Sequence, residues 1–278
     1  MKLIADSGST KTDWVLLNSD GTTESRLHTE GINPVHQREA DIRAILSTLL
    51  ASLHAPLTSI HFYGSGLRPE LVPAMRSLLA EVFAVDAEAV EAESDLLGAA
   101  RALCGRSEGV ACILGTGANS CLYDGCRIVQ NTPALGYILG DEGSGAVLGR
   151  NLLNALYKGL LPKELKQLFE EEMQLTMAQV IERVYRQPLA NRWLASLTPF
   201  ISRHKEQFGQ LSMLVVDAFA NFLRRNVQPY GRTDLPLSAT GSIAWHFQTE
   251  LAHAASLLTL RVGRVEQSPL EGLVRYHQ

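Results

Sequence analysis

Short apolar runs separated by polar turns open the chain. Residues 3–5 and 14–17 are apolar, the residues between them are polar, and 18–21 (Asn-Ser-Asp-Gly) have the composition of a hairpin turn. This pattern predicts three successive strands. Apolar positions at helical spacing then predict helices over 36–53 and 69–83, and the short apolar runs at 60–63 and 90–93 predict strands. With a further helix beginning near Asp95, the predicted order is βββαβαβα.

The same pattern restarts near residue 109. Apolar runs at 110–114, 121–123 and 127–129 are separated by a Gly/Ser/Thr turn and by an Asp-Gly turn, as in the first half. Two such openings in one chain indicate an internal duplication, whereas unrelated hairpins would share no further order. The elements predicted after them are helices over 145–158, 163–172, 176–186, 189–202 and 205–227, a strand-turn segment at 237–243, a helix over 243–257, a strand at 260–262 and a last helix from Pro269.

Composition limits the classes of function. The 278 residues suggest two domains, and 46% hydrophobic content supplies two cores. A net charge of -4 gives no electrostatic reason to expect nucleic acid or a membrane surface as partner. The N-terminus lacks the apolar core of a secretion signal and no apolar stretch approaches about 20 residues, so we expect a cytoplasmic protein. The four cysteines lack zinc spacing and are expected to be core thiols.

Three Gly/Ser/Thr turns follow apolar strands, at 6–12, 115–120 and 240–242. Glycine lets a backbone approach an anion closely, and successive N–H groups with hydroxyls supply donors. One such turn is usually only a hairpin, but three of them predict two phosphate clamps and a nucleoside site. The chain has no GxxxxGK[ST] loop, and the glycines at 143–149 have the wrong spacing for a dinucleotide fingerprint.

Acidic residues stand beside these turns. Asp6 ends the first strand, where a carboxylate either caps the turn or holds Mg²⁺ through water against nucleotide phosphates. Lys11 is either a phosphate contact or a solvated hairpin lysine. Asp95 and Asp141 each precede a helix, so each fits a capping role as well as a functional one. The functional alternative for Asp95 is a general base for phosphoryl transfer, and for Asp141 a contact to sugar hydroxyls.

Taken together, these residues resemble the BadF/BadG/BcrA/BcrD-type ATPases, and within them the N-acetylglucosamine kinases. The matching segments are DSGSTKTDW (6–14), GIN (31–33), SDLLGAA (94–100), ILGTGANS (113–120), GDEGSG (140–145) and TGSIA (240–244). The resemblance implies an α/β fold of two ribonuclease-H-like (actin-like ATPase) domains around an ATP cleft. We expect domains at 1–106 and 107–268, the second with a helical insertion and the first joined by a C-terminal helix at 269–278.

The resemblance also assigns roles to single residues. Asp95 takes the place of the catalytic acid that accepts the proton of the sugar hydroxyl. The residues expected at ATP and its Mg²⁺ are Asp6, Gly8, Ser9, Thr10, Lys11, Gly115, Thr116 and Gly241. The residues expected at the sugar, besides Asp95, are Asn33, Gly117, Asn119 and Asp141.

One position departs from the pattern. The N-acetylglucosamine kinases carry a tryptophan shortly before GDEGS, where this chain has Leu135, so glucosamine or another hexosamine stays open as acceptor. The sequence therefore predicts an ATP-dependent kinase acting on the C6 hydroxyl of N-acetylglucosamine or a related amino sugar, and the resemblance suggests a homodimer. Three alternatives remain: the iron–sulfur activator ATPase of radical dehydratases, a non-catalytic sugar sensor of the same fold, and a kinase for a different acceptor.

Overall fold

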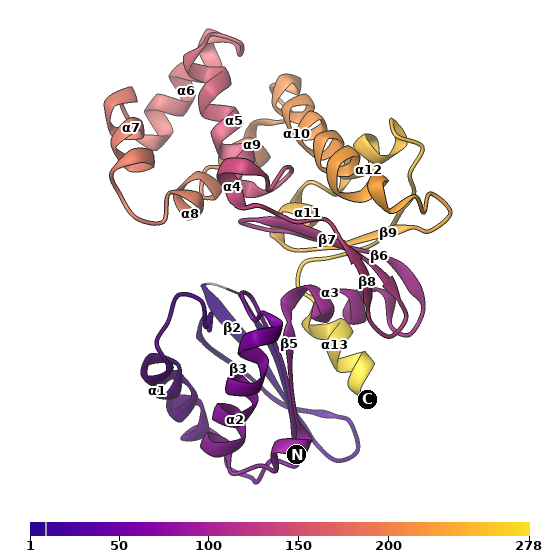
Figure 1. The fold of residues 1–278 in the computed structure, drawn as a ribbon. Helices are drawn as coiled ribbons and strands as arrows, with labels where there is room; N and C mark the ends of the chain where they lie inside the picture. Colours follow the sequence, from indigo (N-terminus) through magenta and orange to yellow (C-terminus); the bar gives the residue numbers. More distant parts are fainter. Residues whose placement is uncertain (9) are drawn as a thin grey trace. The chain divides into compact units, whose positions relative to one another are not determined.

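A computed structural model describes residues 1–8 and 10–278, and the chain divides into two compact units (Figure 1). Unit 1 comprises Met1–Ser107, Asp124–Ile128 and Ser268–Gln278, and unit 2 comprises Glu108–Tyr123 and Val129–Gln267. Each unit contains one five-stranded sheet with flanking helices.

The sheet of unit 1 has the order β3-β2-β1-β4-β5. Its strands are β1 (Lys2–Ser7), β2 (Lys11–Leu17), β3 (Thr23–Glu30), β4 (Ser59–Gly64) and β5 (Val90–Ser94). Its helices are α1 (Glu39–Leu50), α2 (Val72–Phe83), α3 (Asp95–Cys104) and α13 (Leu270–His277). The first three strands are antiparallel neighbours, whereas β1, β4 and β5 run parallel, so their carboxyl ends share one edge.

Both faces of this sheet are buried. Alternate residues of β1 belong to different core clusters: Leu3 and Ala5 pack with residues of α1 and α2, whereas Ile4 packs with α3 and α13. Because successive side chains of a strand point to opposite faces, a sheet covered on both sides needs continuous apolar strands. This explains the uninterrupted apolar runs at 3–5 and 14–17.

The C-terminal helix α13 belongs to unit 1 although it is last in sequence. Leu270, Leu273 and Val274 are buried with Ile4 and Tyr63 of the sheet. A Cβ on Gly272 would lie 2.5 Å from the carbonyl oxygen of Ala102, so a glycine is what permits close packing of α13 on α3 (Figure 1).

Unit 2 repeats this strand order. Its sheet is β10-β9-β6-β7-β8, built from β6 (Glu108–Leu114), β7 (Ala118–Asp124), β8 (Ile128–Asn131), β9 (Leu237–Thr240) and β10 (Val262–Glu266). Counting from the first strand of each unit, the two orders are identical, and β6–β9 and β9–β10 are parallel as are β1–β4 and β4–β5. The shared order supports an internal duplication.

The helices of unit 2 pack over one large core that includes alternate residues of β6. They are α4 (Gly136–Leu139), α5 (Gly145–Tyr157), α6 (Lys163–Met173), α7 (Met177–Tyr185), α8 (Ala190–Ala195), α9 (Thr198–His204), α10 (Gly209–Phe222), α11 (Ser242–His246) and α12 (Gln248–Ser256). The α6–α9 segment has no counterpart among the described residues of unit 1. Among the described residues, no helix combines the length and apolarity that a membrane span needs.

Four predicted elements were wrong in extent. The single helix expected over 189–202 is two helices, α8 and α9. In a continuous helix Pro199 would lack the N–H that donates to the carbonyl of Ala195, and its ring would clash with that carbonyl. The helix expected from 205 begins at Gly209, and the helix expected over 243–257 is interrupted at Phe247. The last strand is Val262–Glu266 rather than 260–262, because Leu260 belongs to the turn that ends α12, where its N–H donates to the carbonyl of Ala255.

Candidate active site

Three polar residues of unit 1 meet at the carboxyl edge of its parallel strands. Asp6 near the end of β1 pairs with Tyr63 of β4, and Gly64 pairs with Ser94 at the end of β5. This register sets Ser65 and Asp95, which follow these two strands, beside Asp6. The N–H of Ser65 donates to the carbonyl of Ser7, which fixes the turn after β4 against β1. In sheets of this type ligands bind at this edge.

Asp95 is held in place at the first turn of α3. Ser94 caps this helix by accepting a hydrogen bond from the N–H of Leu97 at 3.2 Å. The carboxylate of Asp95 accepts hydrogen bonds from the hydroxyl of Ser65 and from the N–H of Leu96. Burial nevertheless raises the pKa of Asp95, because desolvation disfavours its charged form more than these donors favour it. An oriented carboxylate with a raised pKa is suited to accept a proton.

Asp6 lies in an acidic environment. Burial, with smaller contributions from the nearby charges of Asp95 and Asp13, raises the pKa of Asp6 to about 7, and Lys11 opposes the shift. The ammonium of Lys11 is 2.8 Å from Asp13, and its side chain is largely exposed. The carboxylates of Asp6, Asp13 and Asp95 thus have only Lys11 as a nearby positive charge. A cluster of carboxylate oxygens with too little positive charge nearby suits a hard divalent cation such as Mg²⁺.

The first turn has its backbone fixed at both ends. The N–H of Gly8 donates to the carbonyl of Lys11, and the N–H of Gly31 donates to the carbonyl of Thr10. Both Gly8 and Thr10 are exposed, so their polar groups are accessible to a ligand. Ser9, predicted to contact phosphate, lies outside the described residues.

Asn33, in the loop that follows β3, lies against the turn that follows β4. Asn33 is buried, its Oδ1 accepts a hydrogen bond from the N–H of Val35, and its own N–H donates to Gln37. A Cβ on Gly66 would lie 2.4 Å from Oδ1 of Asn33. Gly66 directly follows Ser65, so Asn33 contacts the turn that orients Asp95.

In unit 2 the second glycine turn packs on the start of helix α5. The N–H groups of Gly145 and Ala146 donate to the carbonyls of Gly115 and Thr116, at 2.8 and 3.2 Å. The GTG and GDEGSG segments, which begin 25 residues apart in sequence, therefore form one structure.

Asp141 stabilises the same structure through a contact with the start of β7. Its backbone adopts a φ of 53°, which aspartate tolerates better than most residues. Its Oδ1 accepts a hydrogen bond from the N–H of Ala118, and its Oδ2 would be 3.2 Å from a Cβ on Gly117. Burial raises the pKa of Asp141, and the charge of Glu142 adds to the effect.

The third turn touches the second. Gly241 has a φ of 113°, and a Cβ there would lie 2.3 Å from the carbonyl oxygen of Leu114 and 3.3 Å from the nitrogen of Gly115. Only glycine allows so close an approach with this backbone. The structure thus brings Gly115, Thr116 and Gly241 together in unit 2, as it brings Asp6, Asn33 and Asp95 together in unit 1.

Asn119 is held by a residue that the motifs did not reveal. The Nδ2 of Asn131, at the end of β8, donates to Oδ1 of Asn119 at 2.9 Å and to the carbonyl of Ser120 at 2.7 Å. Asn131 stands in a polar stretch without a distinctive pattern, so only the pairing of β7 with β8 identifies it.

Leu135, the residue that departs from the kinase pattern, is 65% exposed and adopts a φ of 63° before the short helix α4. Ile138 and Leu139 of α4 are also exposed, at 72% and 74%. Unit 2 therefore displays an apolar surface on the segment that leads into Asp141.

Comparison with known proteins identifies the family of this chain. No protein-family model matches the chain, and no curated protein matches it. A solved structure from Porphyromonas gingivalis, provisionally named an N-acetylglucosamine kinase, is 44% identical over 100% of this chain and 98% of its own, with a TM-score of 0.91. The chain belongs to this N-acetylglucosamine kinase-like family of carbohydrate kinases.

More distant structures agree on the fold of the kinase-like chain. A provisionally named N-acetylglucosamine kinase from Chromobacterium violaceum is 20% identical over 100% of this chain and 98% of its own, with a TM-score of 0.65. A glucokinase from Streptomyces griseus, solved with glucose and AMPPNP, is 13% identical over 99% of this chain and 98% of its own, with a TM-score of 0.55. The predicted α/β fold, with two mixed sheets of the actin-like, hexokinase type, is confirmed.

Proposed function

We propose that the protein is an ATP-dependent sugar kinase of the BadF/BadG/BcrA/BcrD type that phosphorylates N-acetylglucosamine or a related amino sugar, at the C6 hydroxyl. The observation that carries the proposal is the arrangement of Asp95, oriented by Ser65, beside the acidic Asp6 at the ligand-binding edge of a sheet. The 44% identity to a protein provisionally named an N-acetylglucosamine kinase supports the same conclusion.

In the proposed reaction Asp95 accepts a hydrogen bond from the acceptor hydroxyl and takes its proton. The hydroxyl oxygen forms a bond to the γ-phosphorus of ATP, the bond from that phosphorus to the β,γ-bridging oxygen breaks, and ADP leaves. Asn33, Asn119 and Asp141 orient the sugar by hydrogen bonds to its hydroxyl groups.

The remaining residues bind the nucleotide. Backbone N–H groups and hydroxyls of Gly8, Ser9, Thr10, Gly115 and Thr116 bind phosphate, with Lys11 as a further contact and Gly241 at the adenosine. The carboxylate of Asp6 holds Mg²⁺ through water. When bound, Mg²⁺ offsets the charge of the phosphates.

The iron–sulfur alternative receives no support from the side chains. An iron–sulfur activator needs accessible cysteine ligands, yet Cys121 is buried and Cys126, its neighbour in sequence, is exposed. A non-catalytic sensor would bind sugar without releasing ADP, so the following assay separates it from a kinase.

ADP release tests the proposal. The protein is assayed with ATP and Mg²⁺ against a panel of hexoses, hexosamines and N-acetylhexosamines, including sugars that lack the C6 hydroxyl. We expect turnover with an amino sugar and none with its 6-deoxy form. Absence of ADP release with every sugar, or release that needs no sugar, would contradict the proposed function.

A further inference from the structure

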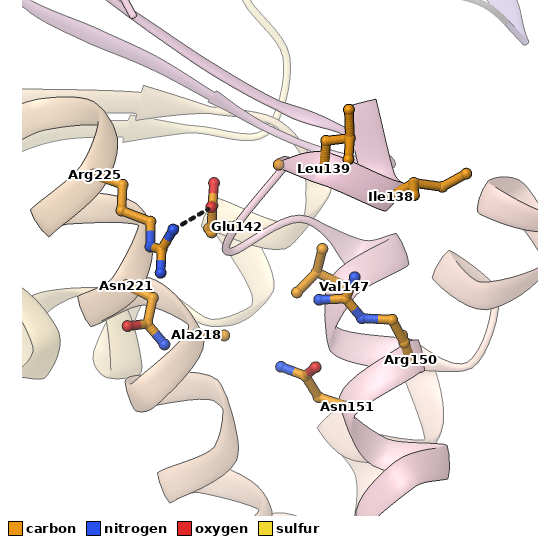
Figure 2. Close-up of a pocket in the computed structure, with 10 residues that line it drawn as sticks. Ile138, Leu139, Glu142, Val147, Arg150, Asn151, Ala218, Asn221 and Arg225 are labelled. Atoms are coloured by element: carbon orange, nitrogen blue, oxygen red, sulfur yellow. Dashed lines mark ion pairs between the residues drawn. The ribbon is translucent and has the colours of Figure 1, made fainter. Parts of the chain in front are cut away.

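A pocket lies in unit 2, between helices α5 and α10 (Figure 2). It has a volume of about 330 Å³, within the range of small-molecule sites, and Gly140 and Glu142 of the loop before α5 are among its lining residues. The proposed function makes no use of this pocket.

Hydrogen-bond donors line the pocket in excess. Arg150 and Asn151 reach it from α5, and Asn221 and Arg225 reach it from the other side (Figure 2). Across the described part of the chain, neither of these two asparagine side chains makes a hydrogen bond that would occupy its amide, and Arg150 makes one, to the carbonyl of Tyr137 at 3.1 Å. The donors face a single carboxylate, that of Glu142.

The contact between Arg225 and Glu142 is a loose one. The two charged groups are 3.7 Å apart, and the Arg225 side chain is 70% exposed. A guanidinium at that distance keeps donors available for a planar, bidentate partner. Two guanidiniums and two amides therefore provide more positive charge and more donors than Glu142 satisfies.

Apolar side chains line the pocket between these donors. Val147 of α5 and Ala218 of α10 belong to the lining, together with the exposed Ile138 of α4. Donors combined with apolar atoms match a ligand that has an anionic group and a ring with both polar and apolar faces.

The pocket and the proposed sugar contact share one loop but lie on different sides of it. The Asp141 carboxylate is hydrogen-bonded at the β6–β7 turn, at the N–H of Ala118. Its neighbour Glu142 turns toward Arg225 and toward Nδ2 of Asn226, which is 3.3 Å away. The backbone between the two sites is fixed, because Gly143 lies against Phe219 and Phe222 of α10.

We propose that this pocket binds a hexose or hexosamine phosphate, the chemical class of the product of the proposed reaction, with its phosphate on Arg150 and Arg225. The proposal rests on the proposed function only for the identity of the ligand. A phosphate monoester is preferred to a carboxylate because its charge approaches -2 and its three oxygens match two guanidiniums and the amides.

Occupancy is coupled to the sugar site through Glu142. A phosphate bound to Arg225 competes with Glu142 for the guanidinium, so the negative charge of Glu142 is less compensated. That charge acts on the adjacent carboxylate of Asp141. We therefore expect the pocket's ligand to raise the KM for the sugar without removing activity at saturating sugar.

Calorimetry without ATP tests the site. Glucosamine 6-phosphate and N-acetylglucosamine 6-phosphate are titrated into protein already saturated with the neutral sugar, so that the proposed sugar site is filled. We expect saturable binding at one site per chain. Arg225→Gln and Arg150→Gln should each weaken it about tenfold or more, as expected for loss of a charge-assisted hydrogen bond.

Arg224→Gln is the matched control, because Arg224 is exposed on the same helical segment, carries the same charge and does not line the pocket. Its binding should equal that of the unchanged protein. The pocket proposal would be overturned by any of four results: no sugar-phosphate binding to protein saturated with the neutral sugar, equal losses in the Arg224 and Arg225 variants, inorganic phosphate binding as tightly as the sugar phosphates, or tighter binding of glucuronate.

The two proposals fail separately. If sugar phosphate binds in the pocket but the protein releases no ADP with any sugar, the pocket proposal is supported and the proposed kinase function is rejected. Normal sugar-dependent ADP release without sugar-phosphate binding in the pocket would support the kinase and reject the pocket proposal.

Discussion

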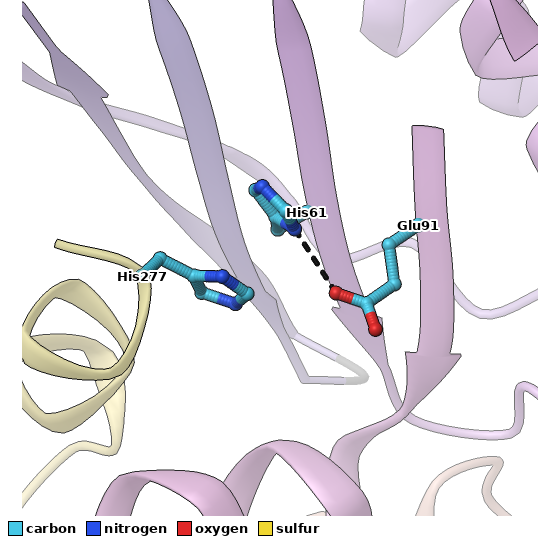
Figure 3. Close-up of side chains that lie close together, drawn as sticks. All are labelled: His61, Glu91 and His277. Carbon is cyan, nitrogen blue, oxygen red and sulfur yellow. Dashed lines mark hydrogen bonds and ion pairs between the residues drawn. The ribbon is translucent and has the colours of Figure 1, made fainter. Parts of the chain in front are cut away.

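The hydroxyl of Tyr63 lies 2.8 Å from Nε2 of His277, although 214 residues separate them in sequence. Tyr63 also accepts a hydrogen bond from Nη1 of Arg101 at 2.7 Å, and Arg101 reaches Glu91 at 2.6 Å. The rings of His61 and His277 stack with centroids 3.8 Å apart, and Nδ1 of His61 is 3.0 Å from Glu91 (Figure 3). This network fastens α13 to the sheet of unit 1.

His61, Glu91 and His277 also have the composition of a metal site, with ligand atoms within 4.8 Å of one another. The guanidinium of Arg101 already neutralises Glu91, and Tyr63 occupies Nε2 of His277. These contacts favour a structural network over a cation site.

Replacement of Tyr63 by phenylalanine should destabilise unit 1. The change leaves Arg101 and His277 without a shared partner in a half-buried setting, which costs about 1–3 kcal/mol. Urea unfolding measures the loss, and hydrogen exchange should show α13 opening more often. Tyr185→Phe, at a residue that is 77% exposed, is the control and should change little. An unchanged free energy of unfolding in Tyr63→Phe would contradict the structural role of the network.

The same network predicts a pH dependence. Burial and the charge of His61 lower the pKa of His277 to about 3, from 6.5 in the unfolded chain, so the folded state resists protonation of this ring. The unfolded state then binds the extra proton between pH 6.5 and 3, and the free energy of unfolding falls as the pH falls through that window. Because hydrogen bonds from His61 and Arg101 lower the pKa of Glu91 to about 2, its own contribution is lost below pH 4.5.

Unfolding of the unchanged protein and of His277→Gln, compared at several pH values between 7.5 and 5, isolates the histidine, because Glu91 stays ionised in that range and the titration of Asp6 is common to both proteins. His277→Gln should flatten the decline relative to the unchanged protein, whereas His54→Gln, at an exposed residue, should leave it unchanged. Parallel slopes in all three proteins would show that His277 titrates normally.

Phosphoryl transfer should depend on the charge of Asp95. Asparagine has the same shape and keeps an oxygen that accepts from Ser65, but it cannot take a proton. We expect Asp95→Asn to fold, to bind sugar, and to lose about 10²–10⁴ in kcat. ADP release measures the rate and calorimetry measures sugar binding. Near-normal kcat would rule out Asp95 as the general base.

Asn131 should act as a positioning residue for Asn119. Asn131→Ala removes one of the two donors to Oδ1 of Asn119 and leaves only the N–H of Ser120, so we expect KM for the sugar to rise severalfold with kcat and KM for ATP nearly unchanged. Gln130→Ala is the control, because Gln130 is the exposed neighbour on β8. A fall in kcat without a change in KM would contradict the positioning role.

The secondary-structure elements were more predictable from the sequence than the contacts between side chains. Strands β1, β2 and β6 were predictable because they are apolar on both faces, and Asp6 and Asp95 because they stand where a strand ends and a helix begins. The contact of Ser65 with Asp95 and that of Asn131 with Asn119 were not predictable, since they depend on which strands pair and in which register. The break between α8 and α9 was missed because a proline can occupy a helix's first turn as well as end the one before it.

Gly66 and Gly159 form a matched pair for testing the place of Asn33 in the sugar site. Both have positive φ, 74° and 71°, so alanine at either position meets a similar backbone cost of about 1 kcal/mol. At Gly66 the added Cβ would lie 2.4 Å from Oδ1 of Asn33, whereas at Gly159, just after α5, no described residue lies within 4 Å of it. Any difference between the two variants therefore reports the displacement of Asn33 rather than the strain of the turn. We expect both to lose comparable thermal stability, but only Gly66→Ala to show a KM for the sugar raised about tenfold or more. Kinetics with sugar and ATP varied in turn measure this, and equal sugar KM values in the two variants would remove Asn33 from the sugar site.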